Sequence, residues 1–203
     1  MAIPLPSLSL IARGLDPHGA DLFIGGTAAA RDVDLLRRHD ISTVVNTAVN
    51  VDVNYVAAPG DGGENGESNA VCRAGFAPFR VFKLGLVDGE NPPGMMLGGY
   101  CILHGALRQT MPHKESYPPQ ARGNVLVHCR EGRSRSVALA ALYLHLQDPT
   151  RFPELEDAVA VVRAKRGLPP EEWFEAPNKK IIDAAAEAAR AIRSLRDLGV
   201  LAI

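Results

Sequence analysis

Hydrophobic positions along this chain follow two patterns: short continuous apolar runs, and longer stretches in which apolar residues recur every three or four positions. The first pattern predicts buried strands and the second predicts helices. Because the two patterns alternate, we expect an α/β domain with a mostly parallel central sheet flanked by helices in three layers. The predicted strands cover 21–26, 41–46, 79–87 and 125–127, and the predicted helices open at 27, 95, 137, 152 and 179.

Two stretches depart from this alternation. Residues 1–18 are mildly apolar but contain Pro4 and Pro6, and no basic region precedes them, which favours a mature N-terminal segment over a signal peptide. Residues 57–75 are rich in glycine and acidic residues and have little to bury, so we expect a flexible loop. A tolerated surface insertion is the favoured interpretation of this loop, and a border of the functional site is the other. With these two stretches included, the length of the chain predicts a single domain spanning 1–203.

Composition and charge narrow the class of protein. A net charge of -1 argues against a nucleic-acid binder that relies on bulk charge, and no apolar run is long enough for a membrane span. The three cysteines form no disulfide framework, which favours a reducing compartment, and we expect the cytoplasm. No spacing typical of metal ligands appears, so we expect no metal and no cofactor. The oligomeric state is left open.

The most informative segment lies between the strand at 125–127 and the helix that follows it. A tight loop that enters a helix N-terminus brings unpaired N–H groups together, which suits an oxyanion. Gly132 permits a backbone conformation or a close approach that a Cβ would hinder. Arg135 can return across the loop and bind two phosphate oxygens. The same positive environment favours the thiolate of Cys129.

This segment reads His128-Cys129-Arg130-Glu131-Gly132-Arg133-Ser134-Arg135-Ser136. It resembles the signature of the cysteine-dependent protein tyrosine phosphatase superfamily, and within it the small single-domain dual-specificity phosphatases. The resemblance implies a phosphotyrosine-phosphatase-like fold. It also implies hydrolysis of phosphate monoesters through a phosphocysteine intermediate, on proteins that carry phosphotyrosine, phosphoserine or phosphothreonine.

The resemblance assigns roles residue by residue. Cys129 is the expected nucleophile, and Arg135 with the loop N–H groups is expected to hold the phosphate oxygens. Asp88, in a Gly/Pro loop after the strand at 79–87, is the expected general acid. Ser136 is expected to donate a hydrogen bond to the departing sulfur, and His128 to support the thiolate through the loop. The expected substrate-binding residues are Arg130, Glu131, Gly132, Arg133, Ser134 and Arg135.

Several alternatives stay open at this point. Glu90, Asp61 and Glu64 compete with Asp88 for the acid role. Arg133 makes the mouth of the loop more positive, which favours a phosphoinositide or phospholipid headgroup, unless it points outward or pairs with an acid such as Glu131.

Other classes of protein also compete with the phosphatase. The segment at 170–178 matches the family only loosely, with Asn178 as the candidate polar group near the site. A rhodanese-type sulfurtransferase and a non-catalytic phosphate-binding module are the rival interpretations.

Overall fold

The computed structural model describes residues 5–55, 78–92, 94–109, 114–116, 121–172 and 176–201. The predicted flexible loop at 57–75 lies outside them, as do Asp61, Glu64 and Cys72. Within these residues the chain forms a five-stranded sheet of order β1-β2-β5-β3-β4. The strands are β1 (Leu8–Leu15), β2 (Ala20–Gly25), β3 (Ile41–Ala48), β4 (Arg80–Leu86) and β5 (Asn124–His128). All neighbouring pairs are parallel except β1 with β2, which confirms a mostly parallel sheet.

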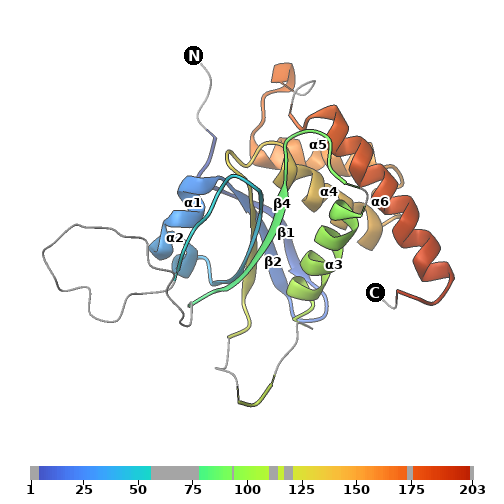
Figure 1. Ribbon diagram of the computed structural model, residues 1–203. Coiled ribbons are helices and arrows are strands. Elements are labelled where there is room, and N and C mark those ends of the chain that lie inside the picture. The colour runs from blue at the N-terminus through green and yellow to red at the C-terminus, as the bar shows by residue number, and fades with distance from the viewer. Residues whose placement is uncertain are drawn as a thin grey trace, which may run out of the picture.

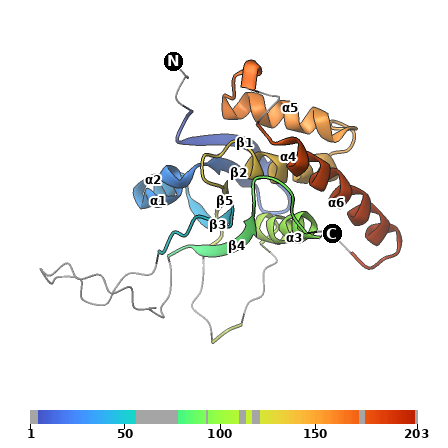
Figure 2. The same ribbon diagram turned by 45° about the horizontal axis from the view of Figure 1, so that its top comes forward.

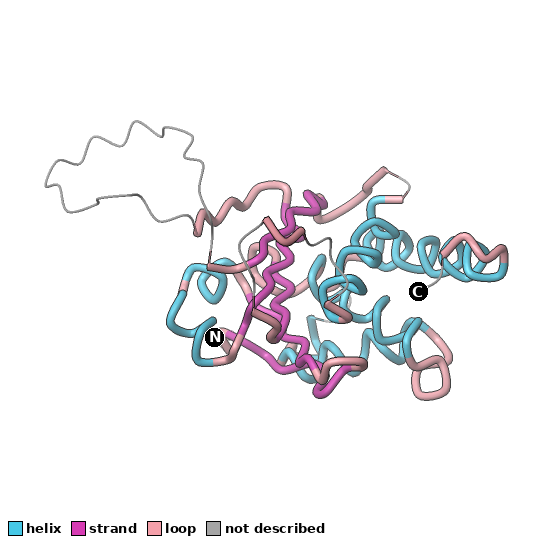
Figure 3. Tube along the Cα trace, turned by 90° about the horizontal axis from the view of Figure 1, so that it is seen from below, coloured by secondary structure: helices cyan, strands magenta, loops and turns pink. Residues whose placement is uncertain are grey.

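Helices cover both faces of the sheet. The two short helices α1 (Thr27–Arg31) and α2 (Val33–Arg38) lie on one face, and the longer helices lie on the other (Figures 1 and 2). Seen from below, the strands run between the two groups of helices (Figure 3). The longer helices are α3 (Met95–Leu107), α4 (Arg135–Gln147), α5 (Leu155–Arg166) and α6 (Lys179–Asp197), and a 3-10 turn, η1, covers Pro170–Glu172.

Strand β5 shows why the sheet sits in the middle. Its residues Val125 and Val127 are fully buried against the longer helices, while Leu126 is buried against the α1/α2 side. Successive side chains of a strand point to opposite faces, so an unbroken apolar run needs cover on both faces. Helix α4, apolar nearly all round, is buried along almost its whole length. The predicted strand and helix therefore meet at the centre of the molecule, and the loop between them starts there.

The N-terminal segment contains a strand that the sequence analysis did not predict. Residues Leu8–Leu15 form β1, which pairs antiparallel with β2 and covers what would otherwise be the edge of the sheet. The stretch Asp16-Pro17-His18-Gly19 that joins the two strands carries turn residues between apolar runs, which is a hairpin signal. The irregular alternation of β1, interrupted by two register shifts, hid the strand from the pattern analysis.

The helix predicted from 27 onward is divided into α1 and α2. Asp32 divides it, because its side chain accepts a hydrogen bond from the backbone N–H of Leu35 at 2.8 Å and so caps a new helix. Thr27 does not cap α1, since Gly26 occupies that position. The Thr27 hydroxyl instead donates to the carbonyl of Arg130 at 3.0 Å, which ties α1 to the loop after β5. Among the described residues, no helix has the length and apolar character needed to cross a membrane.

Two buried histidines make the stability of this fold depend on pH. Burial lowers the pKa of His104 and of His128 to about 4. Both rings are thus neutral in the folded chain, whereas in the unfolded chain they take up protons below a pH of about 6.5. The free energy of unfolding should be fully retained above that pH and should fall as the pH drops from about 6.5 towards 4.

Urea denaturation between pH 7.5 and 4.5 measures this decline. His104→Phe should reduce its slope, because it removes one of the two imidazoles that take up a proton on unfolding. His18→Gln, which replaces an exposed histidine, provides the matched control. A free energy of unfolding that stays constant across this pH window would contradict the neutral buried state.

Candidate active site

The site is built on the loop that joins β5 to α4. His128 ends the strand and Arg135 begins the helix, which confirms the predicted strand, loop and helix. The loop lies against the turn after β2. Gly132 has a φ of +72°, and a Cβ there would lie 2.6 Å from the carbonyl oxygen of Gly25, so both predicted reasons for a glycine apply.

Cys129 is 2% exposed, and its sulfur lies among hydrogen-bond donors. The backbone N–H of Gly132 donates to Sγ at 3.2 Å, and the Ser136 hydroxyl lies 3.4 Å from it. Burial by itself raises the pKa of this thiol. The hydroxyl of Ser136, the backbone N–H groups of Ser136 and Arg133, and the charge of Arg135 outweigh burial, so the pKa of Cys129 is lowered. The loop therefore favours a thiolate.

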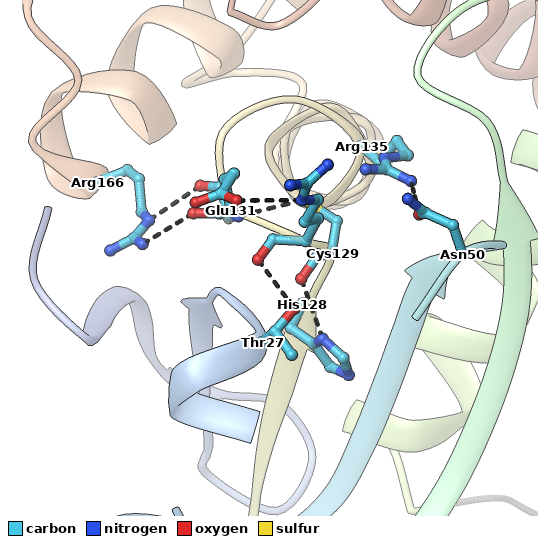
Figure 4. A network of polar contacts seen from close by, with 9 residues as sticks. Thr27, Asn50, His128, Cys129, Glu131, Arg135 and Arg166 are labelled. Atoms are coloured by element: carbon cyan, nitrogen blue, oxygen red, sulfur yellow. Dashed lines mark hydrogen bonds and ion pairs between the residues drawn. The ribbon is translucent and has the colours of Figure 1, made fainter. Parts of the chain in front are cut away.

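Arg135 faces the same cavity as Cys129. The guanidinium is 6% exposed, and its Nη1 donates to the side-chain oxygen of Asn50 and to the carbonyl of Leu86, both at 3.2 Å. Its Nε is buried and has no hydrogen-bond partner within the described residues. These contacts hold Nη1 of the guanidinium, and Figure 4 shows the one with Asn50. The sequence analysis missed Asn50, which follows β3 without any motif around it.

The cavity has a volume of about 550 Å³. Its floor is the loop, and its walls come from the ends of two parallel strands and from the approach to α6. The lining residues are Val49, Asn50, Val87, Asp88, Cys129, Arg130, Glu131, Arg133, Ser134, Arg135 and Ala176. A crevice at the carboxyl ends of parallel strands is the usual place for a ligand in an α/β fold. Its volume is several times that of a phosphate group, so it has room for a phosphate and a sizeable part of the molecule that carries it.

Asp88 lies on the wall of this cavity, and its Oδ1 accepts a hydrogen bond of 2.5 Å from the Ser134 hydroxyl. Glu90 is directed elsewhere, since it pairs with Lys180 at 3.3 Å and does not line the cavity. The side chain of Asn91 fastens the loop around Asp88, because it bonds the N–H and C=O of Val87. Asn91 is a second residue that the sequence analysis missed.

The two other arginines of the loop are each paired with a carboxylate. Arg130 lies 3.4 Å from Glu131, and both of these side chains are about two-thirds exposed. Arg133 forms an ion pair with Glu172 of η1. Of the two interpretations of Arg133, the structure supports pairing with an acid, although the acid is Glu172 and not Glu131.

The remaining predicted residues support the loop. The Nδ1 of His128 lies 3.2 Å from the carbonyl oxygen of Cys129. The side chain of Asn178 caps α6 by accepting from the N–H of Lys180 at 3.0 Å. The backbone N–H of Asn178 donates to Ser134 Oγ at 3.0 Å. No cluster of three or more histidine, cysteine or acidic side chains that could bind a metal occurs within the described residues.

Comparison with known proteins identifies the fold. No protein-family model matches the chain. The phosphatase domain of Yvh1 from Chaetomium thermophilum superposes with a TM-score of 0.58 and 21% identity over 97% of this chain and 99% of that one. A mouse putative dual specificity phosphatase complexed with zinc tungstate gives 0.57 and 22%, covering 100% and 96%.

A third solved structure of the same fold belongs to a protein of another kind. The human tyrosine phosphatase-like serine/threonine/tyrosine-interacting protein gives a TM-score of 0.54 and 21% identity, covering 85% of this chain and 93% of that one. At these sequence identities, the comparisons show that the backbone arrangement is shared. The chain therefore has the fold of the dual-specificity phosphatases, which is the fold that its signature segment predicts.

Proposed function

We propose that this chain is a phosphatase that hydrolyses phosphate monoesters through a phosphocysteine intermediate. One observation carries the proposal: the thiol of Cys129, with its lowered pKa, and the guanidinium of Arg135 line one cavity, which is large enough for a phosphate group and part of the molecule that carries it. A nucleophile and a cation on separate surfaces would not support this chemistry. Here the cation, the loop N–H groups and the sulfur surround the same space.

In the first step, the sulfur of Cys129 attacks phosphorus, so that a P–S bond forms while the P–O bond to the leaving group breaks. Arg135 and the loop N–H groups bind the equatorial oxygens, on which charge concentrates in the transition state. The leaving oxygen takes a proton from Asp88, which the Ser134 hydroxyl holds at the cavity wall. The products of this step are the free alcohol or phenol and the phosphocysteine.

In the second step, water attacks phosphorus, and the P–S bond breaks. The carboxylate of Asp88 now accepts a proton from this water, which reverses its role in the first step. The sulfur leaves as a thiolate. The Ser136 hydroxyl, 3.4 Å from Sγ, and the N–H of Gly132, 3.2 Å from it, stabilise that departing charge. The chain returns to its starting state with inorganic phosphate released.

The fold alone does not separate an enzyme from a binding module, because similar structures include both phosphatases and a phosphatase-like interacting protein. The side chains favour the enzyme. A module needs only the anion-binding loop, whereas this chain also places Ser136 against the sulfur and Asp88 at the cavity wall. The chemistry requires a reduced thiol, which supports a reducing compartment such as the cytoplasm.

The rim of the cavity favours substrates with a single phosphate. Arg130 and Arg133, the cations that would bind additional phosphates, are paired with Glu131 and Glu172. An anionic group would have to compete with a carboxylate for each of them. A phosphorylated protein side chain, which presents one phosphate, therefore fits better than a polyphosphorylated inositol lipid.

Hydrolysis of para-nitrophenyl phosphate tests the proposal. The wild-type chain should turn this substrate over without added metal, and Cys129→Ser should lower kcat by at least about 10³-fold. Tungstate should still bind Cys129→Ser, because the loop N–H groups and Arg135 remain. A wild-type chain that binds tungstate but hydrolyses nothing would be a binding module. Cyanide-dependent turnover of thiosulfate would identify a sulfurtransferase instead.

Replacement of the acid should affect substrates according to their leaving groups. Asp88→Asn should lower kcat by about 10²-fold or more for phenyl phosphate, whose leaving oxygen needs a proton. A phosphate ester with a strongly acidic phenol should lose far less. The matched control is Glu90→Gln, which removes a carboxylate from the same loop outside the cavity. Equal losses for both substrates in Asp88→Asn would remove Asp88 from the acid role.

Release of Arg133 should change the preference among substrates. Glu172→Gln breaks the ion pair and should raise kcat/KM for a doubly phosphorylated peptide about fivefold, the order of one ion pair near the protein surface, with little change for a singly phosphorylated one. The neighbouring Glu171→Gln serves as the control. The gain should vanish when Arg133→Gln is added. A Glu172→Gln variant with an unaltered ratio between the two peptides would show that Glu172 does not influence selectivity.

A further inference from the structure

The most deeply buried charged side chain of the described structure is not one of the predicted site residues. Arg166, the last residue of α5, is 2% exposed. Its guanidinium donates to the carbonyl of Gly132 at 2.9 Å, the carbonyl of Glu131 at 3.3 Å and the hydroxyl of Ser9 at 3.0 Å. It also donates to the carbonyl of Pro6. All of these acceptors are neutral, although a buried charge is costly unless an opposite charge compensates it.

The two loop carbonyls belong to consecutive peptide units. In a trans peptide unit, the carbonyl of one residue and the N–H of the next point in opposite directions. The carbonyl of Glu131 faces Arg166, and the N–H of the same unit, on Gly132, donates to Cys129 Sγ at 3.2 Å. The carbonyl of Gly132 also faces Arg166, and the N–H of that unit, on Arg133, is a further hydrogen-bond donor to the sulfur.

Arg166 thus lies behind the loop, and Cys129 lies in front of it. Figure 4 shows the two side chains on opposite sides of the loop, with the bonds of Arg166 ending on the loop carbonyls. The contact is close, since a Cβ on Gly132 would lie 3.0 Å from Arg166 Nη2. A planar fork that binds two neighbouring carbonyls fixes the rotation of both peptide planes, which a single point donor cannot do.

We infer that Arg166 is the positioning residue of the active site: by holding the carbonyls of Glu131 and Gly132 behind the loop, it aims the N–H groups of Gly132 and Arg133 at the sulfur and at a bound oxyanion. It does so without touching the substrate. The positive charge of Arg166 also stabilises the thiolate of Cys129, and that thiolate compensates the buried charge of Arg166. Burial lowers the pKa of Arg166 and the negative charge of Cys129 opposes that shift. This role rests on the proposed function in one respect, namely that the oxyanion bound by the loop is the phosphate being transferred.

The test measures the thiol directly. The rate of Cys129 alkylation by iodoacetamide, followed by mass spectrometry as a function of pH, gives the thiol pKa without requiring phosphatase activity. Calorimetry with tungstate gives the affinity of the oxyanion site. Both are measured on the full chain for the wild type, Arg166→Met, Arg166→Lys and the control Lys165→Met. Lys165 is a matched control because it also ties α5 to β1, through the carbonyl of Ile11 at 2.6 Å, but has no bond to the loop.

Arg166→Met should raise the thiol pKa by about one unit or more and weaken tungstate binding about tenfold or more. Arg166→Lys should give smaller changes in the same direction, because it keeps the charge but not the fork. Lys165→Met should lower thermal stability without moving either quantity. If Arg166→Met does not fold, Arg166→Lys is judged by the same criterion.

A thiol pKa in both Arg166 variants equal to that of Lys165→Met would overturn the inference and leave Arg166 a merely structural residue. Failure of the proposed function gives a different result. The wild-type chain could have an acidic thiol and tungstate affinity that both depend on Arg166, and yet hydrolyse no phosphate ester. That result would support the role of Arg166 and contradict the proposed phosphatase activity.

Discussion

The structure depends on one interaction, the hydrogen bonding of backbone N–H groups to the sulfur of Cys129. Such donors are available only where the chain does not use them in a strand or a helix. The loop between β5 and α4 meets this condition, because it leaves the sheet at its centre and enters a helix that is buried nearly all round. Cys129 is itself 2% exposed, so that each donor interacts more strongly with the anion than it would in solvent.

The same constraint explains why distant parts of the chain meet at this loop. The turn after β2 approaches so closely that Gly132 cannot carry a side chain. Asn50 after β3 and Leu86 at the end of β4 bind Arg135, and Arg166 from α5 binds the loop carbonyls. Each strand that ends at this edge of the sheet adds a contact. The parallel arrangement is therefore what brings Cys129, Arg135 and Asp88 to one cavity.

Much of this arrangement could be predicted from the sequence. The local pattern around Cys129, an apolar run followed by a polar loop and an apolar helix, places Gly132, Arg135 and Ser136 with respect to the sulfur, because residues this close in the chain have few ways to fold. The position of Asp88 could also be predicted, because the end of a strand before a Gly/Pro loop is recognisable in a sequence. Its contact with Ser134 is a product of the folded structure.

Other features depend on tertiary contacts that leave no local signal. Arg166 ends an amphipathic helix and resembles any basic residue that complements a helix dipole, and only the packing of α5 reveals that it is buried. Asn50 has no motif around it. Strand β1 has an irregular alternation, and its place in the sheet is set by pairing with β2. The ion pair of Arg133 could not be predicted, because its partner Glu172 lies in η1, and the sequence at 170–178 does not define where η1 lies in the fold.

The hydrogen bonds from Arg166 to Pro6 and Ser9 give the start of the chain an unexpected importance. A shortened version that begins at β2 would keep every residue of the signature and look complete by sequence. It would nevertheless open a buried guanidinium to water from the rear and remove two of its acceptors. A shortened chain that keeps this guanidinium buried therefore has to include residues that precede the first motif.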